Sequence, residues 1–310
     1  MIIGTIKLED KVPCSEKARK MGGSQIWLNE NEELTVHEML KAICVVSAND
    51  CTVAMAEFVG GTEEAFVQQM NDRAKELGML NTTFKNCHGI DEDGHVTTAK
   101  DIALMSAELM KNHPSITEYT TIWMDELRGG KSQLVNTNKL VRNYSGATGL
   151  KTGSTSLALY NLSATATKNG MNLISVIMKG PTSDIRFNEA RKLLDYGFAN
   201  YSYKEFGKKD EVVKTLTVSK GIEKEVNIIY EEDAGTIMKK GQEKDVVQSV
   251  NINENLVAPL KKGDKVGEVV FSMNNEEVGA INLVVDKDVK KLNVGNMIGH
   301  VYNSWFCFMR

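Results

Sequence analysis

The stretch LKTGST, residues 150–155, decides how the first part of this 310-residue sequence is interpreted. A lysine and several hydroxyl-bearing residues surround one glycine there. An ammonium group attracts a carboxylate, a hydroxyl adds a directed hydrogen bond, and glycine lets a ligand approach the backbone. An exposed strand also offers its main-chain groups to an extended peptide. The stretch therefore indicates a carboxylate-binding site built around Lys151, Thr152 and Gly153.

The residues that follow this stretch predict an antiparallel pair of strands. Residues 157–167 and 171–179 are rich in β-branched and aliphatic side chains, and Lys168-Asn169-Gly170 joins them. Asn-Gly is a strong signal for a tight hairpin turn. We therefore expect LKTGST at the start of the first strand of this pair. A helix should follow and end near Tyr201.

The residues before the sheet predict helices. Thr35 and Glu38 have the spacing of a capping box, and the helix that they begin should break at 47–50 and resume. Thr62 and Thr98 are expected to begin two more helices. Helices followed by an antiparallel sheet and a closing helix predict an α+β domain over residues 1–201.

The remainder of the chain has a different pattern. Between residues 205 and 290, short alternating runs are separated by Lys-Gly, Asn-Asn and Gly-Asp turns, which predicts a small all-β domain. In residues 293–310 apolar side chains recur at helical spacing, which predicts an amphipathic helix. Two alternatives stay open for this helix: it lies on a membrane surface, or it packs on the protein. Its polar face has only Arg310 as a basic residue, whereas interfacial helices usually carry more.

Composition excludes some functions. The formal net charge is −4 and no cluster of Lys and Arg with interleaved aromatic residues occurs, so nucleic acid is not an expected partner. No apolar run is long enough to cross a bilayer. The N-terminal stretch MIIGTIKLEDKV lacks the parts of a signal peptide, so the chain taken literally stays in the cytoplasm. The five cysteines match no zinc motif and are expected to be small buried apolar residues.

A second motif, Ser47-Ala48-Asn49, makes K-T-G stronger evidence for a functional site. By itself the serine and amide in a helix break would be a cap, and a lone K-T-G is weak evidence. Together, S-x-N followed by K-T-G makes two of the three elements of the active-serine penicillin-recognising signature, whose first element is S-x-x-K.

With these motifs the sequence resembles the D-alanyl-D-alanine carboxypeptidases, the low-molecular-mass penicillin-binding proteins of peptidase family S11. The resemblance covers almost the whole chain and includes the β domain and the terminal helix. The segments that carry it are MGGSQIWL (21–28), SAND (47–50), HVTTAKD (95–101), NTNKLV (136–141), GLKTGST (149–155) and LLDYGF (193–198).

The resemblance implies a serine-type hydrolase that removes the terminal D-alanine from peptidoglycan stem peptides, in cell-wall maturation, outside the cytoplasm and associated with the membrane. In such enzymes the S-x-x-K serine attacks the bond between two D-alanines, the lysine of that motif is its base, and water hydrolyses the acyl-enzyme. The family needs no cofactor and no metal for this. Ser47 would relay a proton toward the departing amine, and Asn49 would hold the backbone of the substrate.

The resemblance also implies how the substrate is bound. Lys151 and Thr152 would bind the terminal carboxylate and strengthen the field around the reacting centre. The strand that continues through Gly153, Ser154 and Thr155 would supply one N–H of the oxyanion hole, and the nucleophile the other. Arg186 is a second candidate for the carboxylate, for which a surface salt bridge is the alternative.

The sequence departs from the family at the nucleophile. No serine in it is followed three positions later by a lysine. In the family the S-x-x-K helix lies upstream of the segment resembling IKLEDKV (6–12). We therefore expect a truncated reading, from a fragmentary gene or a misplaced start, that lacks the nucleophile and the export signal. That helix is central and buried in this fold, so we expect uncovered apolar faces, low stability and no covalent adduct with benzylpenicillin.

Other interpretations were weighed. One is a non-catalytic relative that binds stem peptide, and another is a class A β-lactamase, against which the β domain and terminal helix argue. The loop HGIDEDGH (88–95) suggests a metal through Asp91, Asp93 and His95. Its spacing fits no standard calcium loop, so a solvated turn is preferred and no metal site is assigned.

Overall fold

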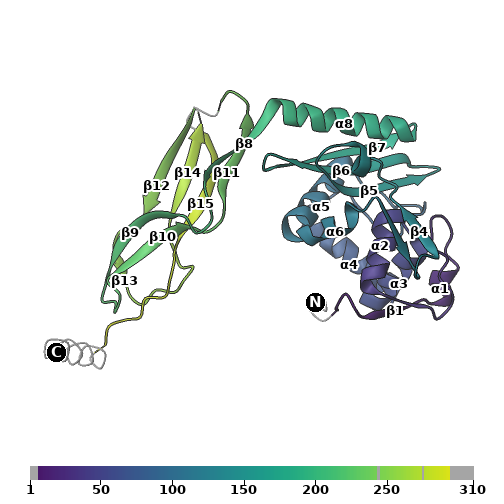
Figure 1. Cartoon of the computed structure of the whole chain (residues 1–310), viewed down its shortest axis with the longest axis horizontal. Helices are drawn as coiled ribbons and strands as arrows, with labels where there is room; N and C mark the ends of the chain where they lie inside the picture. Colours follow the sequence, from purple (N-terminus) through teal and green to yellow (C-terminus); the bar gives the residue numbers. More distant parts are fainter. Residues whose placement is uncertain (1–5, 243–244, 274–275, 294–310) are drawn as a thin grey trace. The chain divides into compact units, whose positions relative to one another are not determined.

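The computed structural model describes residues 6–242, 245–273 and 276–293 (Figure 1). Its contacts divide the chain into two compact units, Met1–Ala199 and Asn200–Arg310. Within the described residues, no helix has the length and apolar character needed to span a membrane. The amphipathic helix predicted for 293–310 falls, from residue 294 onward, outside the described residues.

The first unit begins with small strands and most of its helices. They are β1 (Lys11–Pro13), α1 (Glu16–Arg19), β2 (Glu33–Thr35), α2 (Val36–Val46), α3 (Asn49–Gly60), α4 (Glu63–Glu76), α5 (Ala99–Asn112), η1 (Pro114–Ile116), α6 (Thr117–Thr120), β3 (Met124–Leu127), β4 (Ser132–Val135) and α7 (Leu140–Asn143). A three-stranded sheet and a long helix complete it. These are β5 (Ala147–Thr155), β6 (Leu159–Lys168), β7 (Met171–Gly180) and α8 (Ser183–Asn200).

The predicted capping box and helix break are confirmed. The Thr35 hydroxyl accepts from the Glu38 N–H at 3.1 Å, and the Glu38 carboxylate accepts from the Thr35 N–H at 2.8 Å. Helix α2 ends because Ser47 adopts a left-handed conformation, with φ 63° and ψ 42°. The break predicted at 47–50 is shorter in the structure, since α3 already begins at Asn49.

Two further helix starts are also as predicted. The Thr62 hydroxyl caps α4 by accepting from the Ala65 N–H at 3.1 Å, and the Thr98 hydroxyl caps α5 by accepting from the Asp101 N–H at 3.1 Å. Each hydroxyl satisfies an N–H that has no partner inside its helix. The segment between these helices is a loop.

The hairpin turn between β6 and β7 is confirmed. Asn169 and Gly170 have φ values of 51° and 76°. Positive φ at both central residues is what a two-residue turn of type I′ requires.

The position of LKTGST was predicted wrongly. It does not begin the first strand of that hairpin but lies in β5, a separate strand that pairs antiparallel with β6. The Thr155 hydroxyl accepts from the Ala158 N–H at 2.9 Å within a turn, so the next strand begins only at Leu159. This strand is hard to recognise from composition, because it has two glycines and no valine, isoleucine or aromatic residue.

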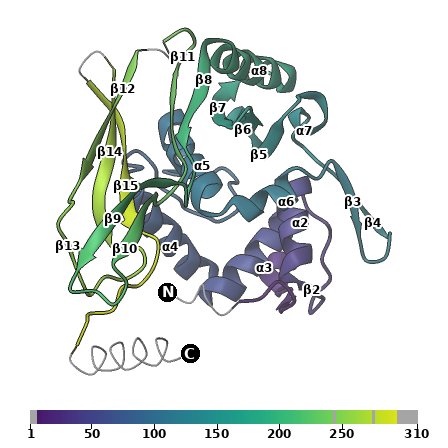
Figure 2. The same cartoon turned by 60° about the vertical axis from the view of Figure 1, so that its left-hand side comes forward.

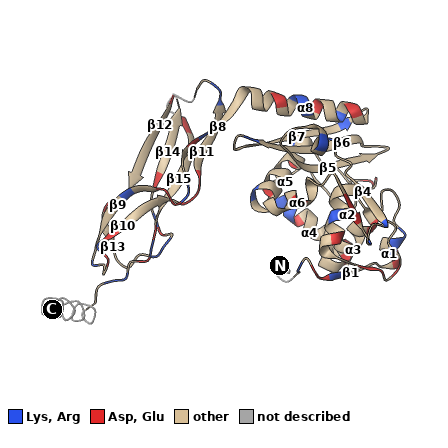
Figure 3. Cartoon of the chain, viewed as in Figure 1, with Lys and Arg blue, Asp and Glu red and all other residues tan. Residues whose placement is uncertain are grey.

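Strand β6 is buried on both faces, between α8 and α5 (Figures 1 and 2). Alternate residues Leu162, Ala164 and Ala166 belong to one apolar core with Phe187, Ala190 and Leu194 of α8. On the other face, the hydroxyls of Ser163 and Ser106 of α5 are 2.7 Å apart. The solvent side of α8 carries charges of both signs (Figure 3), such as the 2.7 Å ion pair of Lys192 and Glu189.

The second unit is all β. Its strands are β8 (Tyr201–Gly207), β9 (Val212–Ser219), β10 (Glu225–Tyr230), β11 (Ala234–Lys239), β12 (Val246–Ile252), β13 (Leu256–Val257), β14 (Lys265–Met273) and β15 (Glu276–Val285). Six form a sheet in the order β12-β14-β15-β10-β9-β13, in which only the β13–β9 pair is parallel, and β8 pairs with β11. The unit thus starts slightly before the expected residue 205. The α+β class with an all-β second domain is confirmed.

Candidate active site

The predicted site residues come together in one cleft of about 570 Å³ in the first unit. Those that line it are Ser47, Asn49, Lys151, Thr152, Gly153, Ser154, Thr155 and Arg186. They come from the break between α2 and α3, from the second half of β5 and from α8. Segments that are distant in the sequence therefore meet at one cleft.

Lys151 is the polar centre of this cleft. Its Nζ donates to Ser47 Oγ at 2.6 Å and to the carbonyl oxygen of Thr152 at 2.8 Å. Burial lowers the pKa of Lys151 to about 8, and the positive charge of Arg186 adds to this effect. Since the ammonium has no carboxylate partner among the described residues, it can receive one from a ligand.

The left-handed conformation of Ser47 explains why its hydroxyl reaches the lysine. A residue that continued α2 would present its side chain along that helix. The turn at Ser47 instead ends α2 just before α3 begins. Such a conformation costs free energy at a non-glycine residue, and Ser47 is the one described non-glycine residue with positive φ that lines the cleft.

Asn49 is held at the start of α3 by contacts with the segment MGGSQIWL. Its side-chain Nδ2 donates to the Gly22 carbonyl at 2.8 Å, and its backbone N–H donates to the Ser24 carbonyl at 2.7 Å. A Cβ on Gly23 would come within 2.8 Å of Nδ2, and Gly23 has φ +77°. Gly23 therefore allows the backbone to approach the amide.

The buried carboxylate of Asp50 also holds the segment MGGSQIWL (21–28) in place. It accepts from the N–H groups of Ile26, at 3.2 Å, and Leu28, at 3.0 Å. The guanidinium of Arg128 donates to the Ile26 carbonyl at 2.9 Å. Sequence reasoning did not find this role of Asp50 and Arg128, because both contacts are set by the packing of distant segments.

Thr137 is a site residue that sequence reasoning missed. Its hydroxyl is 2.7 Å from the hydroxyl of Thr152, and its N–H donates to the Val45 carbonyl at 3.0 Å. It therefore ties β5 to the end of α2. The segment NTNKLV, already singled out for its resemblance, was the available signal.

Arg186 lies inside the protein, so the alternative of a surface salt bridge is wrong. Only 7% of the residue is exposed, and its Nη1 donates to the carbonyls of Gly153 at 3.2 Å and Asn161 at 3.1 Å. The guanidinium lies over the rings of Phe187 and Tyr160. Its Nε has no hydrogen-bond partner within the described residues, and burial lowers its pKa. A buried cation without a counter-ion is prepared to bind an anion.

The opposite wall of the cleft is the loop that was considered for metal binding. Asn86, His88, Gly89 and Ile90 line the cleft, as does His95. In the described part of the chain, no three side chains of His, Cys, Asp or Glu form a group that could hold a metal ion. The carboxylate of this loop nearest the site makes protein contacts instead, which are described below.

A second cavity of about 570 Å³ adjoins the cleft and shares Lys151, Thr152 and Gly153 with it. Its lining is mostly apolar and includes Leu77, Ile102, Met105, Leu109, Leu150, Leu162 and Met178. It also offers binding energy to an apolar segment that packs there.

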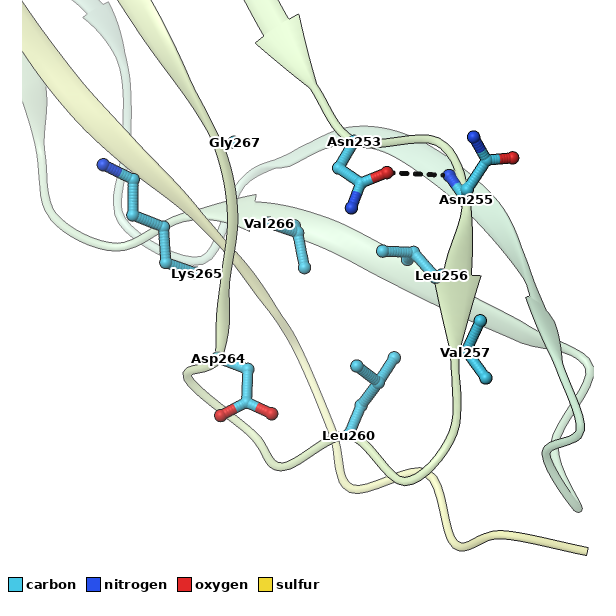
Figure 4. A pocket seen from close by; sticks show the side chains of 9 residues that line it. All are labelled: Asn253, Asn255, Leu256, Val257, Leu260, Asp264, Lys265, Val266 and Gly267. Carbon is cyan, nitrogen blue, oxygen red and sulfur yellow. Dashed lines mark hydrogen bonds between the residues drawn. The ribbon is translucent and has the colours of Figure 1, made fainter.

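The second unit contains a cavity of about 680 Å³, shown in Figure 4. Leu256, Leu260 and Val266 point toward it, and the Asn253 side chain accepts from the Asn255 N–H at 3.1 Å. None of its lining residues is a serine, cysteine or histidine. Its charged lining residues are Asp264 and Lys265, and none of the residues of the predicted motifs lies in it.

Comparisons with known proteins agree with this site. The family model described as D-alanyl-D-alanine carboxypeptidase, peptidase S11, matches residues 2–182, and that of the penicillin-binding protein 5 C-terminal domain matches residues 201–291. The D-alanyl-D-alanine carboxypeptidase DacF of Bacillus subtilis is 40% identical over 309 residues, covering 98% of this chain and 79% of the relative. The chain belongs to the D-alanyl-D-alanine carboxypeptidases of family S11, which are serine hydrolases.

Solved structures lead to the same family. Penicillin-binding protein 5 from Haemophilus influenzae is 32% identical, with a TM-score of 0.74, and the match covers 93% of this chain and 85% of that one. Penicillin-binding protein D2 from Listeria monocytogenes, solved in the ampicillin-bound form, is 30% identical with a TM-score of 0.57. That match covers 63% of this chain and 79% of the Listeria chain.

Proposed function

We propose that the cleft binds the D-Ala-D-Ala end of a peptidoglycan stem peptide for a serine-type carboxypeptidase reaction in cell-wall maturation. The observation that carries this proposal is the 2.6 Å hydrogen bond between Lys151 Nζ and Ser47 Oγ in a cleft that is also lined by Arg186, a buried arginine with no carboxylate partner among the described residues. Two cations without carboxylate partners suit the terminal carboxylate of a peptide.

Each polar group has a role in this proposal. Lys151 and Thr152 hold the carboxylate, with Arg186 behind them, while Asn49 holds the peptide backbone. Ser47 relays a proton toward the departing amine. Its hydroxyl can do so because it accepts a hydrogen bond from Lys151 and can donate one at the same time. Strand β5 is at the edge of its sheet, so its residues Gly153 to Thr155 can pair with an extended substrate.

The attack itself needs a serine that is not among the motifs of these 310 residues, since none of their serines begins an S-x-x-K. We therefore expect this chain to bind the peptide without forming an acyl-enzyme. Intact-mass measurement after incubation with benzylpenicillin checks this, and a mass increase equal to the drug would contradict it.

Binding is tested by nuclear magnetic resonance titration of the labelled chain with an N-acetylated peptide ending in D-Ala-D-Ala. We expect shifts in residues of β5 and of the 47–49 turn, and no saturation with the L-Ala-L-Ala peptide or with the C-terminal amide. Lys151→Met should weaken binding at least about tenfold, because a charge-assisted contact is lost. The exposed Lys131→Met is the matched control. Equal binding of the amide would overturn the assignment of the carboxylate site.

A second candidate is a non-catalytic protein that only recognises stem peptides. The lack of S-x-x-K in the sequence favours it. Release of D-alanine from the pentapeptide, measured with the same preparation, would support the first candidate and contradict the second, whereas binding without release is expected of this chain under both.

The substrate chemistry also suggests where the protein works. We place it outside the cytoplasm, where peptidoglycan is, with contact to the membrane through residues 293–310. Sedimentation with anionic vesicles tests the contact, and a chain lacking 293–310 that sediments equally would refute it.

A further inference from the structure

The two walls of the cleft are joined at one place by a carboxylate. Asp91, in the loop that forms one wall, accepts from the Ser156 hydroxyl at 3.2 Å and from the Leu157 N–H at 3.3 Å. Ser156 and Leu157 lie in the turn that follows β5. We call these two hydrogen bonds the Asp91 bridge. The hydroxyl of Thr155, at the end of β5, also interacts with this carboxylate and is the largest contribution to lowering the pKa of Asp91.

The loop behind the bridge is held in a defined shape. The Asn86 amide donates to the Ile90 carbonyl at 3.0 Å and to the Glu92 carboxylate at 3.0 Å, and its oxygen accepts from the Gly89 N–H at 2.7 Å. Asn86 is itself buried, and its three hydrogen bonds are partly buried. Asp91 follows Ile90 directly in the chain, and Ile90 lines the cleft.

The bridge lies where a bound peptide leaves the site. We take a peptide whose carboxylate is at Lys151 and Thr152 to run along the free edge of β5 toward Thr155, since on the other side the Thr148 carbonyl already accepts from the Thr120 hydroxyl at 2.6 Å. At about 3.3 Å per residue, it reaches the bridge after about three to four residues. The two terminal D-alanines do not extend that far.

We propose that Asp91 is a positioning residue that holds Ile90 over the Thr155 end of β5, so that the cleft recognises the residues of the stem peptide upstream of D-Ala-D-Ala. This inference rests on the proposed function, and it deepens that function by giving the site a preference for longer peptides. The reacting end of the peptide is not touched by Asp91.

The test compares two ligands on the full chain by titration: N-acetyl-D-Ala-D-Ala, and a pentapeptide with the same C-terminus. In Asp91→Ala we expect the pentapeptide to lose about three- to tenfold in affinity, the range of one or two hydrogen bonds, and the dipeptide to be unchanged. Asp91→Asn keeps an acceptor oxygen and should retain most of the affinity. Asp93→Ala is the matched control, since the Asp93 side chain has no hydrogen bond or ion pair within the described residues.

A second measurement follows the bridge without any ligand. In Asp91→Ala, amide hydrogen exchange should rise in both 88–94 and 155–158, and in Asp93→Ala in neither. An equal loss for both peptides would mean a general structural defect and would overturn the proposal, as would unchanged or improved pentapeptide binding. If the unmodified chain binds neither peptide, the proposed function is wrong and the preference falls with it, while the exchange data still report whether the bridge holds the loop.

Discussion

At the scale of single residues, two side chains set the chemistry of the cleft, Lys151 and Ser47. The lysine keeps its charge only below a pKa of about 8, because burial disfavours the ammonium. The serine accepts a hydrogen bond from it in a backbone conformation that costs free energy. The pKa of Lys151 and the backbone conformation of Ser47 each lead to a testable prediction.

We expect peptide affinity to fall as the pH rises above about 8, because Lys151 then loses the charge that attracts the carboxylate. One pKa unit corresponds to about 1.4 kcal/mol, so the fall is at most about tenfold per pH unit. Titration of the D-Ala-D-Ala peptide between pH 6.5 and 9.5 measures it. Lys151→Met should bind weakly and show no such fall, whereas Lys131→Met should follow the unmodified chain.

The backbone of Ser47 predicts a difference between two small substitutions. Ser47→Gly and Ser47→Ala both remove the hydrogen bond to Lys151, but only glycine adopts φ 63° without strain. We expect the alanine variant to be less stable than the glycine variant by about 0.5–1 kcal/mol in urea unfolding. Equal stabilities would mean that the conformation carries no cost.

At the scale of elements, local signals placed the helices and long-range contacts placed the strand that carries the site. The capping hydroxyls of Thr35, Thr62 and Thr98 act within one turn of their own helices, and each was predicted. Strand β5 was not, because its identity as a strand depends on pairing with β6. The Asn-Gly turn could be predicted since it needs only its own two residues.

Helix α2 supplies the element-scale prediction. Thr35→Ala removes the cap and leaves the Glu38 N–H without its partner, which should cost about 1 kcal/mol in the free energy of unfolding. Thr35→Ser keeps the hydroxyl and should cost less. Because the lost cap satisfied an N–H of the first turn of α2, we also expect faster amide hydrogen exchange in that turn in Thr35→Ala. An unchanged exchange rate there would contradict the capping role.

At the scale of the whole molecule, each unit has its own apolar core. The second unit buries Ile228, Phe271 and Leu283 together in one core. The core of α1 to α3 and the core under α8 belong to the first unit. The apolar cavity beside the cleft also belongs to it.

These separate cores predict that residues 200–310 fold without the first unit. A chain of that segment should show β-type circular dichroism and a cooperative urea transition, because its buried side chains contact one another. We expect the full chain to show two transitions, with the first unit unfolding earlier and binding an apolar fluorescent dye through its cavity. One coincident transition for both units would show that they stabilise each other.

The sequence by itself determined the order of helices and strands with local signals, the two-part division of the chain, and the motifs Ser47-Ala48-Asn49 and Lys151-Thr152-Gly153. Caps, turns and alternation act over a few residues, and they can be read without the fold. Only the tertiary structure decided that Thr137 and Arg186 support the same strand and that Asp91 joins the walls of the cleft. Those contacts connect residues brought together by packing, which no short stretch of sequence specifies.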